Sequence, residues 1–223
     1  MIANLTNPEF CYLAGRYPGA LAHLYSPGSE PARGSIHFFP YALDNGAYVA
    51  WEKGQAFDFD SWRRLLDWGA KAYSQPLWVL VPDSVANKDE TLERWYKYSP
   101  EVISRGFQPA FAAQDGMIPS DAPPDCIIFL GGTTPWKESA IQPWCSVLPN
   151  RVHVGRVNNT RRLMKCYHAG AISVDGTGWW HKSSVRGKVI DLDNINSQPE
   201  RDRWNGLSGQ MRELIDFVEG TNE

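Results

Sequence analysis

The sequence predicts an α/β protein built as a TIM-type (β/α) barrel, and three observations support this prediction. Continuous apolar runs of strand length alternate with segments of helical periodicity, a pattern typical of a parallel sheet covered on both faces. Seven such strands can be counted between residues 10 and 178, close to the eight of a barrel. Nearly every strand ends in a polar residue with glycine or proline nearby. A doubly wound open sheet is the alternative architecture.

The first half of the chain supplies two strand-like runs before its first clear helix. Strands are predicted over 10–15 and over 35–48, where the apolar run stops at the turn sequence Asp44-Asn45-Gly46. A helix over 57–73 follows, and then a buried strand over 77–83. The next helix spans 87–106, and we expect Pro100 to break or kink it.

The second half continues the alternation as far as residue 178. Its predicted elements are strands over 109–116, 126–132, 151–157 and 171–178, a short helical stretch over 135–148 interrupted by Pro143, and a helix over 159–170. From about residue 179 the pattern is irregular, and 187–193 is the candidate for an eighth strand. A final amphipathic helix is expected at about 207–219.

The composition fits one compact domain over residues 1–223. A chain of this length with 43% hydrophobic residues can bury a sizeable core, and no repeat or linker divides it. No run approaches the roughly 20 apolar residues of a membrane helix, and the first ten residues lack the features of a signal peptide. We therefore expect a cytoplasmic protein with no membrane partner.

The cysteines and the net charge narrow the range of functions further. The four cysteines are scattered without CxxC spacing, so neither a thiolate zinc site nor a disulfide framework is expected, and buried neutral thiols are the simpler interpretation. A net charge of −3 excludes a generally basic surface for nucleic acid. Local basic patches, which are what phosphate binding needs, stay open.

The polar residues at the strand ends are the most informative feature. In a parallel barrel these ends converge on one mouth, where active sites form. One such residue is ordinary, because Asp and Asn favour turns and helix caps. Six positions in register from different strands are much harder to explain by capping alone. They are Asp44, Asp83, Gln114, Gly131 with Gly132, Arg156 and Asp175.

Two of these residues, Asp44 and Asp175, form a candidate catalytic carboxylate pair. One carboxylate can stay ionised and attack carbon, while the other keeps a proton and acts as a general acid. The usual electrophile for such a pair is the anomeric carbon of a sugar. The residues by themselves therefore predict glycosyl transfer or glycoside hydrolysis.

Five short motifs between about residues 40 and 180 resemble those of the tRNA-guanine transglycosylase superfamily. The resemblance is stronger to the phage and bacterial branch that inserts 7-deazaguanine bases into DNA. The motifs are Asp44-Asn45-Gly46-Ala47-Tyr48, Val81-Pro82-Asp83, Gln114 in AAQDG, Gly131-Gly132 in FLGGTTPW, and Asp175 in SVDGTG.

The resemblance implies base exchange in DNA. Asp175 would attack C1′ of a deoxyguanosine and expel guanine, and a base such as 7-cyano-7-deazaguanine would then attack the covalent intermediate. Asp44 would transfer the protons of the leaving and entering bases. Tyr48 would stack on the base, while Asp83, Gln114, Gly131 and Gly132 would bind its edge. The implied partners are DNA and the free base, and no cofactor is needed.

Two departures from the tRNA enzymes bear on the substrate. Those enzymes hold zinc through clustered cysteines and a histidine, and this sequence has no such cluster. The chain is also much shorter, so we expect a barrel without the zinc subdomain, no metal site, and DNA in place of tRNA. The resemblance leaves a homodimer or a partner protein open, and the cytoplasm would be that of the host if the chain is phage-encoded.

Two further groups could bind nucleic acid. The arginines after the sixth strand could grip phosphates, although a solvated helix face explains them equally well; they are Arg156, Arg161 and Arg162. The loop after Asp175 could stack on or wedge DNA, or simply pack over the barrel rim; its residues are Trp179, Trp180, Lys182 and Arg186. The isolated histidines, His153 among them, are interpreted as structural.

Two alternative functions remain at this point. The same carboxylates could serve a glycoside or nucleoside hydrolase, or the chain could be a nucleic-acid-binding barrel without catalysis. The base-edge residues distinguish these alternatives, because a sugar hydrolase has no reason to carry Asp83, Gln114 and the Gly131–Gly132 pair together.

Overall fold

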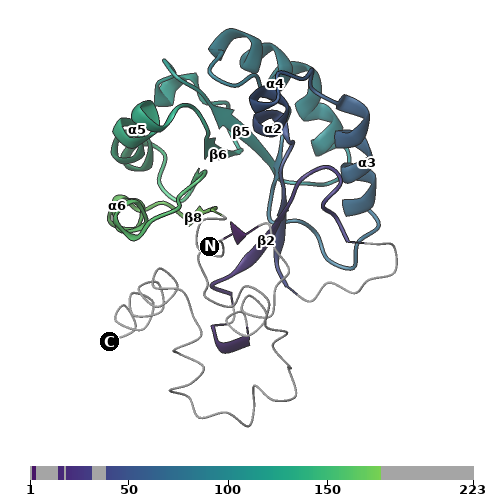
Figure 1. The fold of residues 1–223 in the computed structure, drawn as a ribbon, viewed down its shortest axis with the longest axis horizontal. Helices are drawn as coiled ribbons and strands as arrows, with labels where there is room; N and C mark the ends of the chain where they lie inside the picture. Colours follow the sequence, from purple (N-terminus) through teal and green to yellow (C-terminus); the bar gives the residue numbers. More distant parts are fainter. Residues whose placement is uncertain (1, 4–14, 18, 32–38, 177–223) are drawn as a thin grey trace.

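Eight parallel strands form one sheet whose order follows the chain in this computed structural model, which describes residues 2–3, 15–17, 19–31 and 39–176 (Figure 1). The strands are β1 (Ile2–Ala3), β2 (Ala22–Tyr25), β3 (Tyr41–Leu43), β4 (Val79–Leu80), β5 (Pro109–Ala113), β6 (Ile127–Leu130), β7 (Val152–Val154) and β8 (Ser173–Val174). Each neighbouring pair is parallel, so all the carboxyl ends lie at the same rim. This order confirms the TIM-type fold, because a doubly wound sheet reverses its strand order.

The helices α3 to α6 lie outside the curved sheet (Figure 1). The helical elements are α2 (Ala47–Glu52), α3 (Phe59–Gly69), α4 (Lys88–Ile103), the 3₁₀ turn η1 (Pro119–Asp121), α5 (Thr134–Val147) and α6 (Thr160–Ala169). Side chains of Asp58, Asn87 and Asn159 cap α3, α4 and α6 by accepting hydrogen bonds from backbone N–H groups in the first turn.

The prolines at positions 100 and 143 do not end their helices, so α4 shows no break at Pro100 and the predicted interruption of α5 at Pro143 is wrong. α4 continues through Pro100 to Ile103, and α5 continues through Pro143 to Val147. A proline removes one backbone hydrogen bond. In each helix, apolar side chains are buried on both sides of the proline, and this packing outweighs the lost bond. The buried residues include Trp95 and Val102 in α4, and Ile141 and Trp144 in α5.

The start of the barrel differs from the sequence prediction. Residues 10–14 of the predicted 10–15 strand lie outside the described residues, and Gly15 is helical. The first strands are instead β1 and β2, and the eight strands are complete without 187–193. β2 was missed because Ala22-His23-Leu24-Tyr25 has neither clear alternation nor a β-branched residue. The segment 187–193, the predicted helix at 207–219, and Trp179, Trp180, Lys182 and Arg186 lie outside the described residues.

Alternate residues of the strands face either the helices or the interior of the barrel. The helix-facing side carries large apolar residues such as Leu43, Phe111 and Val154. The interior is lined by a second, smaller cluster comprising Ala22, Leu24, Ala42, Trp78, Leu80, Ala110 and Ala112, with Ile127 and Phe129 beside it. Because side chains alternate with a period of two, residues two positions beyond an interior residue continue this face into the mouth. Asp44 follows Ala42 in this way, and Gln114 follows Ala112.

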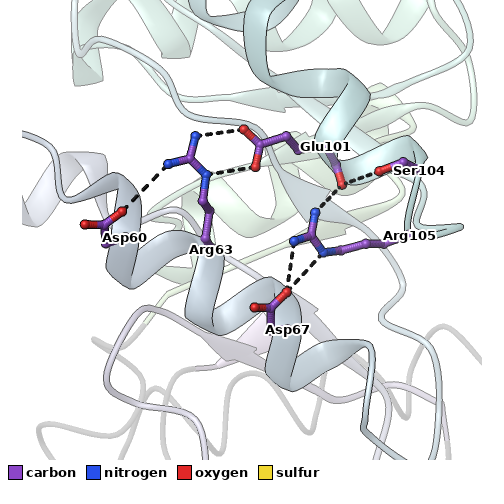
Figure 2. Close-up of polar contacts among 6 residues, drawn as sticks. All are labelled: Asp60, Arg63, Asp67, Glu101, Ser104 and Arg105. Atoms are coloured by element: carbon purple, nitrogen blue, oxygen red, sulfur yellow. Dashed lines mark hydrogen bonds and ion pairs between the residues drawn. The ribbon is translucent and has the colours of Figure 1, made fainter.

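Ion pairs join α3 to the end of α4 on the outer layer (Figure 2). Arg63 donates two hydrogen bonds to Glu101, at 2.9 and 2.8 Å, and Arg105 lies 2.9 Å from Asp67. Partly exposed pairs of this kind contribute only about 0–1 kcal/mol each. They orient the two helices and have no part in the mouth of the barrel, which makes them useful control positions.

The described cysteines agree with the expectation of neutral, buried thiols. Cys126, Cys145 and Cys166 are buried and form no disulfide, whereas Cys11 lies outside the described residues. Burial raises the pKa of Cys126 and Cys145 to about 11 and that of Cys166 to about 12. Within the described part of the chain, no helix has both the length and the apolar character that crossing a membrane requires.

Candidate active site

Asp44 lies directly after β3 at the carboxyl rim and is only partly exposed. One carboxylate oxygen accepts a hydrogen bond from the Asn45 N–H at 2.9 Å, and the other accepts from the Ser26 hydroxyl at 3.1 Å. Burial raises the pKa of Asp44 to about 6, with a further contribution from the charge of Asp175. These hydrogen bonds lower the pKa in part but do not restore its ordinary value.

Asp175 follows β8 and is held by two nitrogen donors. The backbone N–H of Arg156 donates to one carboxylate oxygen at 2.9 Å, and Nε2 of His153 lies 3.0 Å from the other. Burial lowers the pKa of His153, which favours the neutral ring. Because a carboxylate can only accept, Nε2 carries the proton, and Nδ1 accepts from the Ser173 hydroxyl at 2.8 Å. The two donors hold both oxygens of the Asp175 side chain in place.

The structure therefore brings Asp44 and Asp175 together at one rim. They are close enough for the charge of Asp175 to raise the pKa of Asp44. Gly155 makes room for this arrangement, because a Cβ there would lie 2.7 Å from the Phe129 ring and 3.3 Å from an Asp175 oxygen. The raised pKa of Asp44 favours its protonated form more than in an ordinary aspartate, as a general acid requires.

A buried polar network lies beside this pair and contains the predicted base-edge residues. Gln114 donates to Asp83 at 2.6 Å, and the Asn45 side chain donates to the other oxygen of Asp83 at 2.7 Å. The Gln114 carbonyl oxygen accepts from the N–H groups of Ala86, at 3.0 Å, and Gly132, at 3.2 Å. Burial raises the pKa of Asp83 to about 6, the Asn45 hydrogen bond lowers it, and the nearby Asp44 raises it.

Asn45 connects the network to the carboxylate pair. Its backbone N–H binds Asp44, while its side chain binds both Asp83 and the carbonyl oxygen of Val81, at 2.8 Å. Sequence reasoning treated Asn45 only as part of a turn signal. Its burial, at 3% exposure, shows that the turn residue also sets the spacing between Asp44 and Asp83.

The two glycines after β6 have different reasons for lacking a side chain. A Cβ on Gly131 would lie 3.0 Å from the Gln114 amide nitrogen, so its absence lets Gln114 lie flat across the mouth. Gly132 has a positive φ of 45°, and a Cβ there would lie 2.4 Å from the Trp136 ring. Close packing against Gln114 and Trp136, together with the positive φ of Gly132, therefore requires glycine at both positions.

Tyr48 and Arg156 face each other across the mouth. Tyr48 lies on α2, and the Arg156 guanidinium carbon lies 4.0 Å from the centre of its ring. The same guanidinium donates to the Gly132 carbonyl oxygen at 2.5 Å. Arg156, predicted to grip phosphate, thus points into the mouth of the barrel.

The other two described arginines that were predicted to bind nucleic acid lie on α6, outside the mouth. Arg161 is exposed. Arg162 forms an ion pair with Glu138 at 2.6 Å and also donates to the carbonyl oxygen of Arg156 at 3.3 Å. The Arg162 guanidinium therefore supports the loop that carries Arg156.

His153 and Lys137 are parts of the site that sequence reasoning missed. His153 is fully buried in the barrel, with ring centroids 4.9 Å from both Trp78 and Phe129. A polar residue in an otherwise apolar strand was the available signal. Lys137 on α5 is also fully buried and donates to the Gly155 carbonyl oxygen at 2.6 Å. Burial lowers its pKa to about 7, and Asp175 opposes this shift; nothing in the helix sequence predicted its burial.

A metal centre is not formed by the described residues. Among residues 2–3, 15–17, 19–31 and 39–176, no group of three or more His, Cys, Asp or Glu side chains could hold a metal ion. The chemistry available here is that of carboxylates, an amide network and an aromatic surface.

The pKa of Asp44 predicts how this residue affects stability with pH. Its folded pKa of about 6 exceeds an unfolded value of about 3.9, so the folded state binds more protons between these pH values. Stability from this group is fully present below about pH 4 and is lost as the pH rises through about 6. We expect the free energy of unfolding of the wild type, minus that of Asp44→Asn, to fall by on the order of 2 kcal/mol from about pH 4 to 7.

Urea unfolding of both proteins at several pH values measures this difference. The asparagine keeps the shape and can still accept the Asn45 N–H, so other titrating groups cancel in the comparison. A difference that stays constant across this range would show that Asp44 has an ordinary pKa.

Comparison with known proteins shows the fold and no more. No protein-family model matches the chain, and no curated protein sequence matches it. A candidate fructose-1,6-biphosphate aldolase from Coccidioides immitis is similar in structure, with a TM-score of 0.57 and 14% identity over 97% of this chain and 86% of the other. A chain of the tryptophan synthase α2β2 complex from Pyrococcus furiosus matches with a TM-score of 0.48 and 13% identity, over 80% of this chain and 87% of that one. The first similarity places the chain among TIM-barrel structures.

Proposed function

We propose that this protein is a DNA-guanine transglycosylase that exchanges guanine in DNA for a 7-deazaguanine base. One observation carries the proposal: the carboxylate pair and the Asp83–Gln114 network meet at one rim and are joined through Asn45. A carboxylate pair alone would suit any glycosidic bond. A buried carboxylate beside a glutamine and a glycine-rich backbone suits the edge of a guanine.

In the first step, Asp175 is the nucleophile and Asp44 the acid. An Asp175 oxygen forms a bond to C1′ of deoxyguanosine while the bond from C1′ to N9 breaks. The electron pair of that bond goes to the purine, which takes up the proton of Asp44. This step needs an ionised Asp175 and a protonated Asp44. The raised pKa of Asp44 favours its protonated form, and the two N–H donors hold the Asp175 oxygens in place.

The second step reverses the roles of the two residues. The incoming 7-deazaguanine base gives its N9 proton to the Asp44 carboxylate, and N9 attacks C1′. The bond between C1′ and Asp175 breaks, and the Asp175 carboxylate is restored. Neither step consumes an oxidant, a reductant or an energy-rich nucleotide.

Recognition of the base rests on its Watson–Crick edge. The donors at N1 and N2 of guanine match the oxygens of Asp83, and O6 matches the N–H of Gly132. In the structure that N–H donates to Gln114 at 3.2 Å, a long contact that a ligand can replace. Guanine and 7-cyano-7-deazaguanine share this edge, so one network serves both the leaving and the incoming base.

Exchange in duplex DNA also requires the target base to leave the helix. Unpairing and unstacking cost a few kcal/mol, and stacking on an aromatic side chain returns about 1–3 kcal/mol. Tyr48 offers an aromatic ring at the mouth, and the edge contacts to Asp83 and Gly132 supply the remainder. DNA and a free base are thus the partners of the proposed reaction, which would take place in the cytoplasm.

Mass spectrometry of nucleosides tests the proposal. DNA is incubated with the protein and 7-cyano-7-deazaguanine, digested to nucleosides, and compared with DNA incubated without the base. We expect 7-cyano-7-deazadeoxyguanosine to appear and deoxyguanosine to fall by the same amount.

Other outcomes would support the alternative functions. Release of guanine that leaves abasic sites, without incorporation, would indicate a hydrolase using the same carboxylates. DNA binding with neither release nor incorporation would indicate a barrel without catalysis.

A further inference from the structure

We infer that Arg156 covers the base site by stacking its guanidinium on the face of Tyr48 on which the purine would stack, and that base binding displaces it. The inference rests on the proposed function, because it concerns how that site receives its base. It changes the role predicted for Arg156, from a phosphate contact to a residue that competes with the ligand.

The distance between the two side chains leaves no room for a base. The guanidinium carbon lies 4.0 Å from the centre of the Tyr48 ring. Stacked groups touch at about 3.5–4.0 Å, so a base between them would need a separation of about 7 Å. A base can stack on this face of Tyr48 only after the guanidinium has moved.

The Arg156 guanidinium also contacts the backbone segment proposed to receive the base edge, at a carbonyl oxygen next to the N–H that would bind O6. Its guanidinium donates to the Gly132 carbonyl oxygen at 2.5 Å, within the same Gly131–Gly132 segment that faces Gln114. Like a guanine, the guanidinium is flat and rich in N–H donors, so it satisfies both the stacking surface and a backbone acceptor. Arg156 is therefore an internal mimic of the ligand.

The backbone conformation of Arg156 positions its side chain for this competition. Its φ of +57° is unusual for a residue other than glycine. This conformation lets the N–H of Arg156 donate to Asp175 at 2.9 Å while the side chain reaches Tyr48. The backbone contact can persist when the side chain swings away, so displacement need not disturb the nucleophile.

Binding of free guanine, measured by equilibrium dialysis with radiolabelled base and no DNA, tests the inference. Arg156→Asn is the variant of choice, because asparagine tolerates a positive φ and is too short to cover Tyr48. Without the competing cation–π contact, we expect this variant to bind guanine about 3- to 30-fold more tightly than the wild type. Arg105→Asn, which removes an arginine from the outer layer, should bind like the wild type.

Tyr48→Leu separates competition from other effects of the substitution. It removes the surface for which guanidinium and base compete, so binding should weaken by about tenfold or more. In a Tyr48→Leu background, adding Arg156→Asn should no longer tighten binding. Thermal unfolding of each variant confirms that it is folded.

The outcomes separate this inference from the proposed function. If the wild type binds guanine and Arg156→Asn binds it equally or less tightly, Arg156 is no competitor, although the exchange reaction stands. If Arg156→Asn tightens binding equally with and without Tyr48, the competition is not for the Tyr48 face and the inference also fails. If no folded variant binds guanine and nucleoside analysis shows no exchange, both proposals fail.

Discussion

The Asp175→Asn protein is expected to exchange no measurable base, with the rate falling by on the order of 10⁴-fold or more. The neutral amide cannot form the bond to C1′, although it can still occupy the place of the carboxylate between His153 and the Arg156 N–H. The amide oxygen can still accept the Arg156 N–H, so the fold should be preserved. Incorporation of radiolabelled guanine into DNA measures the rate.

A covalent intermediate gives this prediction a second readout. When no free base is supplied, some wild-type protein should remain bound to DNA on a denaturing gel, and Asp175→Asn should not. Asp60→Asn is the matched control, because Asp60 lies on α3 with a largely exposed side chain (Figure 2). Exchange by a folded Asp175→Asn protein at a rate near that of the control would remove Asp175 from the mechanism.

The Asp83→Asn protein is expected to lose guanine recognition, with base exchange reduced on the order of 10³- to 10⁴-fold. Both Asn45 and Gln114 donate to Asp83, so an amide at this position would set its own donor against one of theirs. It would also turn a donor toward N1 or N2 of the base. An unpaired buried donor costs about 1–3 kcal/mol, so the variant should also be less stable by about that amount.

Urea unfolding separates the loss of stability from the loss of recognition. In buffer without urea, at a low temperature where the variant is fully folded, base exchange should still be lost and guanine binding should be undetectable. Asp89→Asn, an exposed position in the first turn of α4, should change neither property. Normal guanine binding by folded Asp83→Asn would show that the base edge is read elsewhere.

The unequal roles of the two carboxylates follow from their surroundings. Asp175 accepts hydrogen bonds from His153 and Arg156, and the buried side chain of Lys137 donates to the Gly155 carbonyl oxygen nearby. Asp44 has a hydroxyl and backbone donors only, and burial dominates its pKa. The sequence shows two aspartates after strands, but it does not show which of them keeps the proton.

Much of the barrel could be predicted from the order of residues alone. Strand runs such as Ile127–Leu130 are continuously apolar, and helices such as α4 begin at a capping residue, here Asn87. Both signals are local in the sequence, so they can be recognised without knowledge of the fold. The short strand β2 escaped prediction because its residues suit a helix as well as a strand, and pairing with β1 and β3 decided its conformation.

The sequence by itself determined that Asp44 and Asp175 lie at the mouth of one barrel. Parallel strands in chain order must end at the same rim, and the period of two fixes which side chains face inward. Only the tertiary structure decided what surrounds the pair: His153 beneath Asp175, Asn45 bridging to Asp83, and Arg156 lying over Tyr48. These contacts join residues distant in sequence, and burial and hydrogen-bond geometry, which set pKa values, exist only once the chain has folded.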